Sequence, residues 1–239
     1  MTNSVLLNNI DHHDLRVIAR HASDYGDGVN IAPVFPTEFE DAQREYPILF
    51  RLDEAGAFQS VVLLGLDRDE NLFLTEAGWQ ARYIPAMHRR GPFTIGLQGR
   101  EGEGPGEPMI HVDLDDPRVG RETGEGLFLP HGGNAPYLEH VAGVLRTLYA
   151  GLEQASSMFA AFDALELIQP VEIQIALSEE EQYSLPGFLT IDQNRLADLD
   201  SMALKQLNQT GYLRLAYLVG ASLGNVNRLI DLKNRKAAG

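Results

Sequence analysis

The chain has 239 residues, 44% of them hydrophobic and 22% charged, which is ordinary for a globular protein with a sizeable core and excludes collagen-like, disordered and coiled-coil classes. Its formal net charge of −15 argues against a nucleic-acid partner, because a duplex footprint needs a basic face. Cysteine is absent, so disulfides, thiolate metal sites and cysteine nucleophiles are excluded.

Hydropathy argues against a membrane protein. No window approaches the roughly 18 uninterrupted apolar residues that indicate a transmembrane helix. The amino terminus lacks a basic segment followed by a long apolar core, so no signal peptide is predicted. We therefore expect a soluble, cytoplasmic protein without membrane insertion.

Short strand patterns dominate the amino-terminal half. Residues 1–30 mix brief apolar runs with turn-prone Asn, Asp and Gly, and the pattern does not decide whether this segment belongs to the core. Strand-like runs separated by turn-forming residues follow at 47–52, 58–66, 71–75, 82–86, 93–97 and 109–114. An antiparallel meander is their simplest arrangement. Residues 99–108 are rich in Gly, Glu and Pro and predict a flexible acidic loop.

The carboxyl-terminal half begins with a long helix. Apolar residues recur at intervals of three and four over 136–166, and Gln169-Pro170 is expected to end the helix. Strict alternation over 171–177 predicts a strand, and 183–191 is its expected hairpin partner. Further helices are predicted at 192–199, 201–208 and 212–234. This order predicts an α+β fold, organised as one domain over residues 1–239.

A series of short motifs between Glu38 and Phe93 identifies a relative. The motifs are Glu38-Phe39, Tyr46-Pro47-Ile48-Leu49-Phe50, Leu64-Gly65-Leu66, Asn71-Leu72-Phe73, Gly78-Trp79, Tyr83-Ile84-Pro85 and Arg89-Arg90-Gly91-Pro92-Phe93. In this order and spacing they resemble the SapC-like family of bacterial proteins, and residues 222–229 resemble the family's usual ending. The family commonly has an aromatic residue between the arginine pair and Pro-Phe, where this chain has Gly91.

The resemblance implies a biological setting rather than a reaction. It implies an association with surface-layer or outer-envelope gene systems. Relatives often occur beside genes for flavin-dependent halogenase-like proteins, cupin-like proteins and TonB-dependent receptors. No established catalytic residues come with it. A peptide-transporter permease of the same name would need several apolar helices, which this sequence lacks.

Basic and aromatic side chains within the same block form the first candidate site. They are Trp79, Arg82, Tyr83, His88, Arg89 and Arg90. Arginine binds carboxylate or phosphate through paired hydrogen bonds, and aromatic rings stack on planar groups. The cluster predicts a site for a small anionic ligand or an acidic peptide. The alternative interpretation is that the arginines pair with surface acids and hold a loop in place.

His111 and Asp113 form the second candidate, a His-x-Asp pair on one face of a predicted strand. Such a pair supplies two of the three protein ligands in non-haem iron oxygenases, and His131 or His140 would supply the third. On this alternative the protein is an enzyme that uses iron, manganese or zinc. The competing interpretation is an ordinary polar strand face, in which case no cofactor is predicted.

Three hypotheses for function follow. The preferred one is a non-catalytic accessory or binding protein of an envelope-related system, which recognises a protein partner or a small anionic ligand. It rests on the family resemblance and on the lack of a complete catalytic set in the sequence. The alternatives are the metal-dependent enzyme and a structural subunit whose long and last helices pack against a partner chain in an oligomer.

Overall fold

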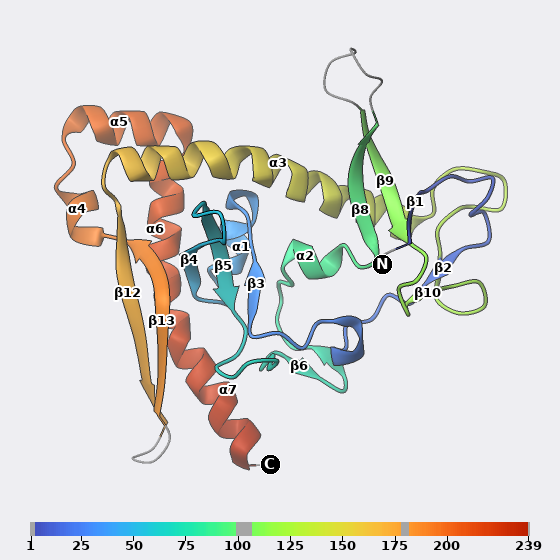
Figure 1. Cartoon of the computed structure of the whole chain (residues 1–239), viewed down its shortest axis with the longest axis horizontal. Coiled ribbons are helices and arrows are strands. Elements are labelled where there is room, and N and C mark those ends of the chain that lie inside the picture. The colour runs from blue at the N-terminus through green and yellow to red at the C-terminus, as the bar shows by residue number, and fades with distance from the viewer. Residues whose placement is uncertain (1–2, 99–106, 178–181, 239) are drawn as a thin grey trace.

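The computed structural model describes residues 3–98, 107–177 and 182–238 and has the α+β architecture expected from the sequence (Figure 1). Strands dominate the amino-terminal half, the long helix α3 (Pro136–Ala164) crosses the molecule, and a hairpin and further helices follow. The predicted loop at 99–108 lies outside the described residues except for its last two positions, which belong to a strand.

The largest sheet joins the two halves of the chain. Its five strands are all antiparallel in the order β12-β13-β4-β5-β3. They are β3 (Ile31–Pro33), β4 (Ile48–Leu52), β5 (Phe58–Leu63), β12 (Ile168–Ala176) and β13 (Gln182–Ile191). The hairpin predicted from alternation is therefore confirmed, and it extends a sheet that begins in the amino-terminal half.

The remaining strands form three small sheets. One has the order β1-β9-β8, a second β10-β2-β11, and a third pairs β6 with β7. Their bounds are β1 (Ser4–Leu6), β2 (Arg16–Val17), β6 (Leu74–Thr75), β7 (Gly78–Trp79), β8 (Phe93–Gln98), β9 (Glu107–Asp113), β10 (Val119–Gly120) and β11 (Glu125–Gly126). The predicted single meander is wrong, because the strand-like runs are divided among separate sheets.

The segment 82–86 is not a strand. Arg82 lies in a bend, residues 83–85 have no regular secondary structure, and the one-turn helix α2 (Ala86–Arg89) follows with Pro85 at the N-cap. Proline lacks a backbone N–H and suits the start of a helix better than a paired strand. This correction matters for the site, because consecutive residues on a helical turn point in different directions.

The first 30 residues contribute to the core. Val5 pairs with Val112 where β1 meets β9. Leu15 and Val17 are 3% and 0% exposed and pack in the same hydrophobic cluster as the first half of α3.

Helix α3 connects two hydrophobic clusters. Leu138, Val141 and Leu145 pack with the β1-β9-β8 sheet, whereas Phe159 and Phe162 pack with the five-stranded sheet. Figure 1 shows α3 running from β8 and β9 to the hairpin β12–β13, with α2 beneath its first half. The apolar face that predicted the helix therefore packs on two different sheets, one along each half of α3.

The ends of the helices differ from the predicted ones in two places. Helix α3 ends at Ala164, and Glu166 has a left-handed φ of 54°, so Pro170 lies inside β12 instead of ending the helix. Strand β12 is at the sheet edge, where proline is tolerated. The predicted last helix is interrupted by a 3-10 turn, Leu223–Asn225.

The other helical segments are short. They are the 3-10 turns Ser23–Tyr25 and Pro36–Glu38, α1 (Phe39–Ala42), α4 (Gln193–Ala197), α5 (Ser201–Thr210), α6 (Tyr212–Ser222) and α7 (Val226–Ala238). Asp192 and Asp200 cap α4 and α5 by accepting backbone hydrogen bonds. No helix in the described ranges is long and apolar enough to cross a membrane.

Candidate functional site

A buried carboxylate, Glu38, holds the start of α2 in place. Its Oε1 accepts hydrogen bonds from the Ala86 N–H and the Tyr83 hydroxyl, both at 2.7 Å, and its Oε2 accepts one from the Phe35 N–H at 3.0 Å. Burial raises the pKa of Glu38, and these hydrogen bonds oppose that effect in part. Glu38 thus ties α2 to the turn before α1 and sets the direction in which the α2 side chains point.

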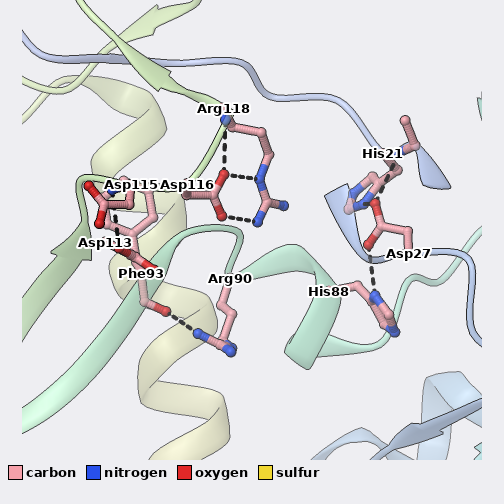
Figure 2. A network of polar contacts seen from close by, with 10 residues as sticks. His21, Asp27, His88, Arg90, Phe93, Asp113, Asp115, Asp116 and Arg118 are labelled. Atoms are coloured by element: carbon pink, nitrogen blue, oxygen red, sulfur yellow. Dashed lines mark hydrogen bonds and ion pairs between the residues drawn. The ribbon is translucent and has the colours of Figure 1, made fainter. Parts of the chain in front are cut away.

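A second buried carboxylate, Asp27, joins the amino-terminal segment to α2. Its Oδ2 lies 3.2 Å from Nδ1 of His21 and accepts the Ala22 N–H at 3.0 Å, while its Oδ1 lies 2.8 Å from Nδ1 of His88 (Figure 2). Burial alone would raise the pKa of Asp27, but the hydrogen bonds from His21 and His88 hold it well below its usual range. Because an ionised carboxylate only accepts, each histidine carries its proton on Nδ1. The orientation of both rings is therefore fixed.

Trp79 packs against both histidines from β7. Its ring centroid lies 5.7 Å from that of His21 and 5.1 Å from that of His88. Its indole N–H donates to the Tyr46 hydroxyl at 2.8 Å, and this hydroxyl donates to the carbonyl of Tyr83. Trp79 therefore supports the two histidines and has its polar atom already satisfied.

These supports border a pocket of about 300 Å³ that we name the cationic pocket. It is lined by Ile18, Ala19, Arg20, His21, Ile84, Arg89, Gly91, Arg118, Tyr137 and His140. The described lining contains three guanidinium groups and two imidazoles but no carboxylate. In a chain with a net charge of −15, this local excess of positive charge marks the pocket as a candidate site for an anion.

Arg118 presents one free edge of its guanidinium group. Its side chain is buried, and its Nε and Nη2 donate to the two oxygens of Asp116 at 2.9 and 2.6 Å (Figure 2). Burial would lower the pKa of Arg118, but the paired hydrogen bonds to Asp116 raise it. The guanidinium also lies over the ring of Tyr25, 5.5 Å from its centroid. Nη1 forms no hydrogen bond with the described residues and remains available as a donor.

Tyr137 and Arg118 converge over Gly91. A Cβ atom at Gly91 would lie 3.8 Å from the Tyr137 hydroxyl and 3.9 Å from Nη1 of Arg118. Burial raises the pKa of Tyr137, so its hydroxyl stays protonated and can donate. Gly91 has a φ of +56° and no side chain, so this corner of the pocket stays open where the resemblance implies an aromatic residue.

Arg89, Arg20 and His140 supply the remaining charge. Arg89 donates from Nη2 to the Tyr83 hydroxyl at 3.2 Å and lies 4.9 Å from the centroid of that ring. Its Nε is buried and has no hydrogen-bond partner. Arg20 and His140 are exposed, and their side chains form no hydrogen bond or ion pair within the described ranges. Several donors around the pocket are therefore not used by the protein itself.

The six binding residues predicted from the sequence do not form one site. Arg89 lines the cationic pocket, whereas Trp79, Tyr83 and His88 support it from behind. Arg90 lines a different pocket, and Arg82 is exposed and lines none of the described pockets. The pocket lining also includes Arg20, His21, Arg118 and Tyr137, which were not predicted as binding residues. They come from three segments that only the fold brings together, so no local pattern signals them.

The alternative metal ligands are not assembled into a site. The described residues contain no group of three or more His, Asp or Glu side chains placed to hold a metal ion. The ring of His111 packs over Gly96, and Asp113 accepts the backbone N–H groups of Asn3 and Asp115 at 3.0 and 3.2 Å. Asp113 thus caps a turn at the end of β9.

His131 and His140 do not complete a set with this pair. His131 is exposed in the turn before α3, and His140 lines the cationic pocket. The His-x-Asp spacing is therefore explained by the pairing of β9 and by the turn after it.

The fold and the pocket define an α+β protein with a pre-formed cationic cavity at the start of its long helix. The sequence model of the SapC family matches residues 7–229, and the chain belongs to that family. The matched range includes every residue that lines the cationic pocket. Neither the curated proteins nor the solved structures compared with the chain gave a match.

Proposed function

We propose that this SapC-family protein is a non-catalytic binding protein whose cationic pocket recognises a small carboxylate or phosphate. The observation that carries the proposal is the convergence of Arg20, Arg89 and Arg118 on one cavity whose described lining has no acidic side chain. Like charges gathered in a partly buried space repel one another, so a bound anion would stabilise the arrangement.

Three acids near the pocket are already engaged behind it. Asp116 is paired with Arg118, Asp27 with the two histidines, and Glu38 with three donors at the start of α2. None of them lines the pocket. Asp116 keeps Arg118 in position, Asp27 keeps His21, and Glu38 holds Tyr83, which contacts Arg89, whereas Nη1 of Arg118 has no hydrogen-bond partner among the described residues. This division into supporting acids and free donors is what a site for an anion requires.

The lining offers hydrogen-bond donors and positive charge, which suits the pocket to binding an anion. Both histidines next to Asp27 use Nδ1 for that carboxylate, which makes them positioning groups here. Family membership supports an accessory role in an envelope-related system, with a protein partner as a further part of the proposal. A cytoplasmic location stays a prediction from the sequence.

Isothermal titration calorimetry at low ionic strength tests the proposal, with sulfate, phosphate and succinate as probes. Arg20→Gln removes an exposed charge that lines the pocket, and Arg82→Gln removes an exposed charge that does not. We expect at least one probe to bind. Arg20→Gln should weaken its binding about tenfold, since hydrogen bonds to charged groups contribute about 1.5–3 kcal/mol. Arg82→Gln should bind like the wild-type protein.

Tyr137→Phe provides a second test, because it removes only the hydroxyl that faces Gly91. We expect several-fold weaker binding with an unchanged melting temperature for the free protein. The proposal would be wrong if none of the three anions bound, or if Arg20→Gln and Arg82→Gln weakened binding equally. Equal weakening would mean that general surface charge, and not the pocket, attracts the anion.

A further inference from the structure

A second cavity lies along the middle of α3, on the side of α2 that presents Met87 and Arg90. It measures about 420 Å³, and we name it the apolar groove. Leu145 and Leu148 of α3 line it together with Met87 of α2 and Ile95 of β8. Its volume lies within the range of about 300–1,000 Å³ that is usual for small-molecule sites.

The groove continues along α3. Phe35 and Leu152 line both the groove and an adjoining hollow of about 500 Å³ that follows the second half of the helix. Leu152 is 57% exposed, one of the few large apolar side chains in the described ranges that face solvent to this extent. The adjoining hollow is more polar, since Asp53, Ser156 and Asp163 also line it, so the apolar lining is that of the groove itself and ends near Leu152.

Arg90 is the one charged side chain in the described lining of the groove. Its Nη1 donates to the carbonyl of Phe93 at 2.7 Å, and its Nε is buried without a hydrogen-bond partner. It forms no ion pair within the described ranges. Burial lowers the pKa of Arg90, and so does the neighbouring charge of Arg118, while the nearby Asp116 is paired to Arg118 (Figure 2). Asp116 offsets part of the charge of Arg90 from a distance, but no carboxylate within the described ranges is paired with Arg90 itself.

We infer that the apolar groove binds an unbranched alkyl carboxylate, with its head group on Arg90 and its chain along Leu148 and Leu152. A carboxylate supplies the negative charge and the acceptor that Arg90 lacks. A flexible saturated chain matches a lining made mostly of Leu, Ile and Met side chains with the rings of Phe35 and Tyr149 beside them. A neutral or cationic amphiphile would bury the same chain but leave the arginine uncompensated.

This site does not depend on the cationic pocket. The two cavities lie on different sides of α2. Arg89 lines the cationic pocket, and the next residue, Arg90, lines the groove. A ligand in the groove would be held mainly by its chain, whereas a ligand in the cationic pocket would be held by its charge. Loss of one site therefore leaves the other testable.

The test is calorimetric titration of the full chain with decanoate, kept below its micelle-forming concentration. Acetate has the same head without the chain, and decyltrimethylammonium has the same chain with the opposite charge. We expect decanoate to bind much more tightly than either. Affinity should rise with chain length from octanoate to dodecanoate, by up to about fourfold for each methylene buried.

Variants locate the site. Arg90→Gln should weaken decanoate binding at least tenfold, whereas Arg82→Gln should have no effect. Thr94 is exposed and lines the groove, so Thr94→Trp should block it while Thr94→Ser leaves it open. If circular dichroism shows that Arg90→Gln does not fold, the Thr94 pair decides the question. Arg20→Gln, in the other pocket, should leave decanoate binding intact.

Several results would overturn the inference. One is the absence of binding with decanoate at up to about 1 mM, which corresponds to about 4 kcal/mol of binding free energy. Another is equal binding by the Thr94→Trp and Thr94→Ser proteins. Equal binding of decanoate and decyltrimethylammonium would also contradict it, because Arg90 would then contribute nothing to recognition.

Discussion

The substitution Asp27→Ala tests the support behind the cationic pocket. Asp27 is 2% exposed and accepts hydrogen bonds from His21, His88 and the Ala22 N–H. Alanine would remove all three interactions at once. It would also release His21, which lines the pocket, from its fixed orientation.

The loss of stability expected for Asp27→Ala can be worked out from the hydrogen-bond donors that would lose their acceptor. Each buried donor without a partner costs about 1–3 kcal/mol, and such effects are not fully additive within one network. We expect a loss of about 3 kcal/mol in the free energy of unfolding for Asp27→Ala. For a chain of this length, about 2–4 °C of melting temperature is lost per kcal/mol, so the expected decrease is about 6–12 °C.

The contribution of Asp27 also has a defined pH range. Hydrogen bonds from the histidines lower its folded-state pKa below the ordinary value of 3.8. A depressed carboxylate stabilises the fold above its unfolded-state pKa, and the stabilisation is lost as the pH falls towards the folded-state pKa. The difference between the wild-type protein and Asp27→Ala should therefore be complete above about pH 4 and shrink below it.

Thermal unfolding followed by circular dichroism is the assay, and Asp24→Ala is the matched control. Asp24 lies in the same turn, is exposed, and its side chain forms no hydrogen bond within the described ranges. If Asp27→Ala melted within 1 or 2 °C of Asp24→Ala, the reasoning about this network would be refuted.

Two further substitutions test other buried polar groups. Burial would raise the pKa of Glu70, but hydrogen bonds from Lys236 and Lys233 help to lower it to about 2. Its contribution, about 2 kcal/mol at neutral pH, should be lost as the pH falls from about 4.5 to about 2, and Glu70→Gln should flatten this acid dependence in urea titrations. Ser222 is fully buried, and its hydroxyl accepts the Ile48 N–H at 2.8 Å. Ser222→Ala should cost about 1–3 kcal/mol in urea unfolding because that N–H loses its acceptor.

Each of these expectations has a contradicting result. Parallel loss of stability below pH 4.5 in Glu70→Gln and the wild-type protein would show that Glu70 does not carry the acid dependence. An unchanged urea midpoint in Ser222→Ala would show that the contact between α6 and β4 tolerates an unpaired N–H.

The helices and strands whose apolar residues recur at a regular interval could be predicted from the sequence. The helix α3 and the hairpin β12–β13 repeat apolar residues at the helical and strand periods, and these periods survive in the fold because each element buries one face. The assignment of 82–86 failed for a related reason. Its short apolar run between turn-forming residues resembles a strand, but Pro85 and the anchoring of Ala86 by Glu38 turn the chain into a helix.

The candidate site was less predictable than the fold. Arg89 and Arg90 are adjacent in sequence and were assigned to one cluster, but a single helical turn sends them into different cavities. Tyr137 and Arg118 lie far along the chain; the packing of α2 on α3 brings Tyr137 to Gly91, and Arg118 reaches the same place from the segment before β10. The arginines in the sequence indicated that an anion site was present. Where that site lies could not be predicted, because it depends on contacts between segments far apart in the chain.

The most direct test of the central claim is a crystal structure of the protein grown with selenate, an anomalous scatterer with the charge and shape of sulfate. We predict an anomalous peak in the cationic pocket, within hydrogen-bond reach of Nη1 of Arg118 and the Tyr137 hydroxyl, and a weaker peak in Arg20→Gln crystals grown at the same selenate concentration. A pocket that holds only water while selenate occupies other surface arginines would contradict the account.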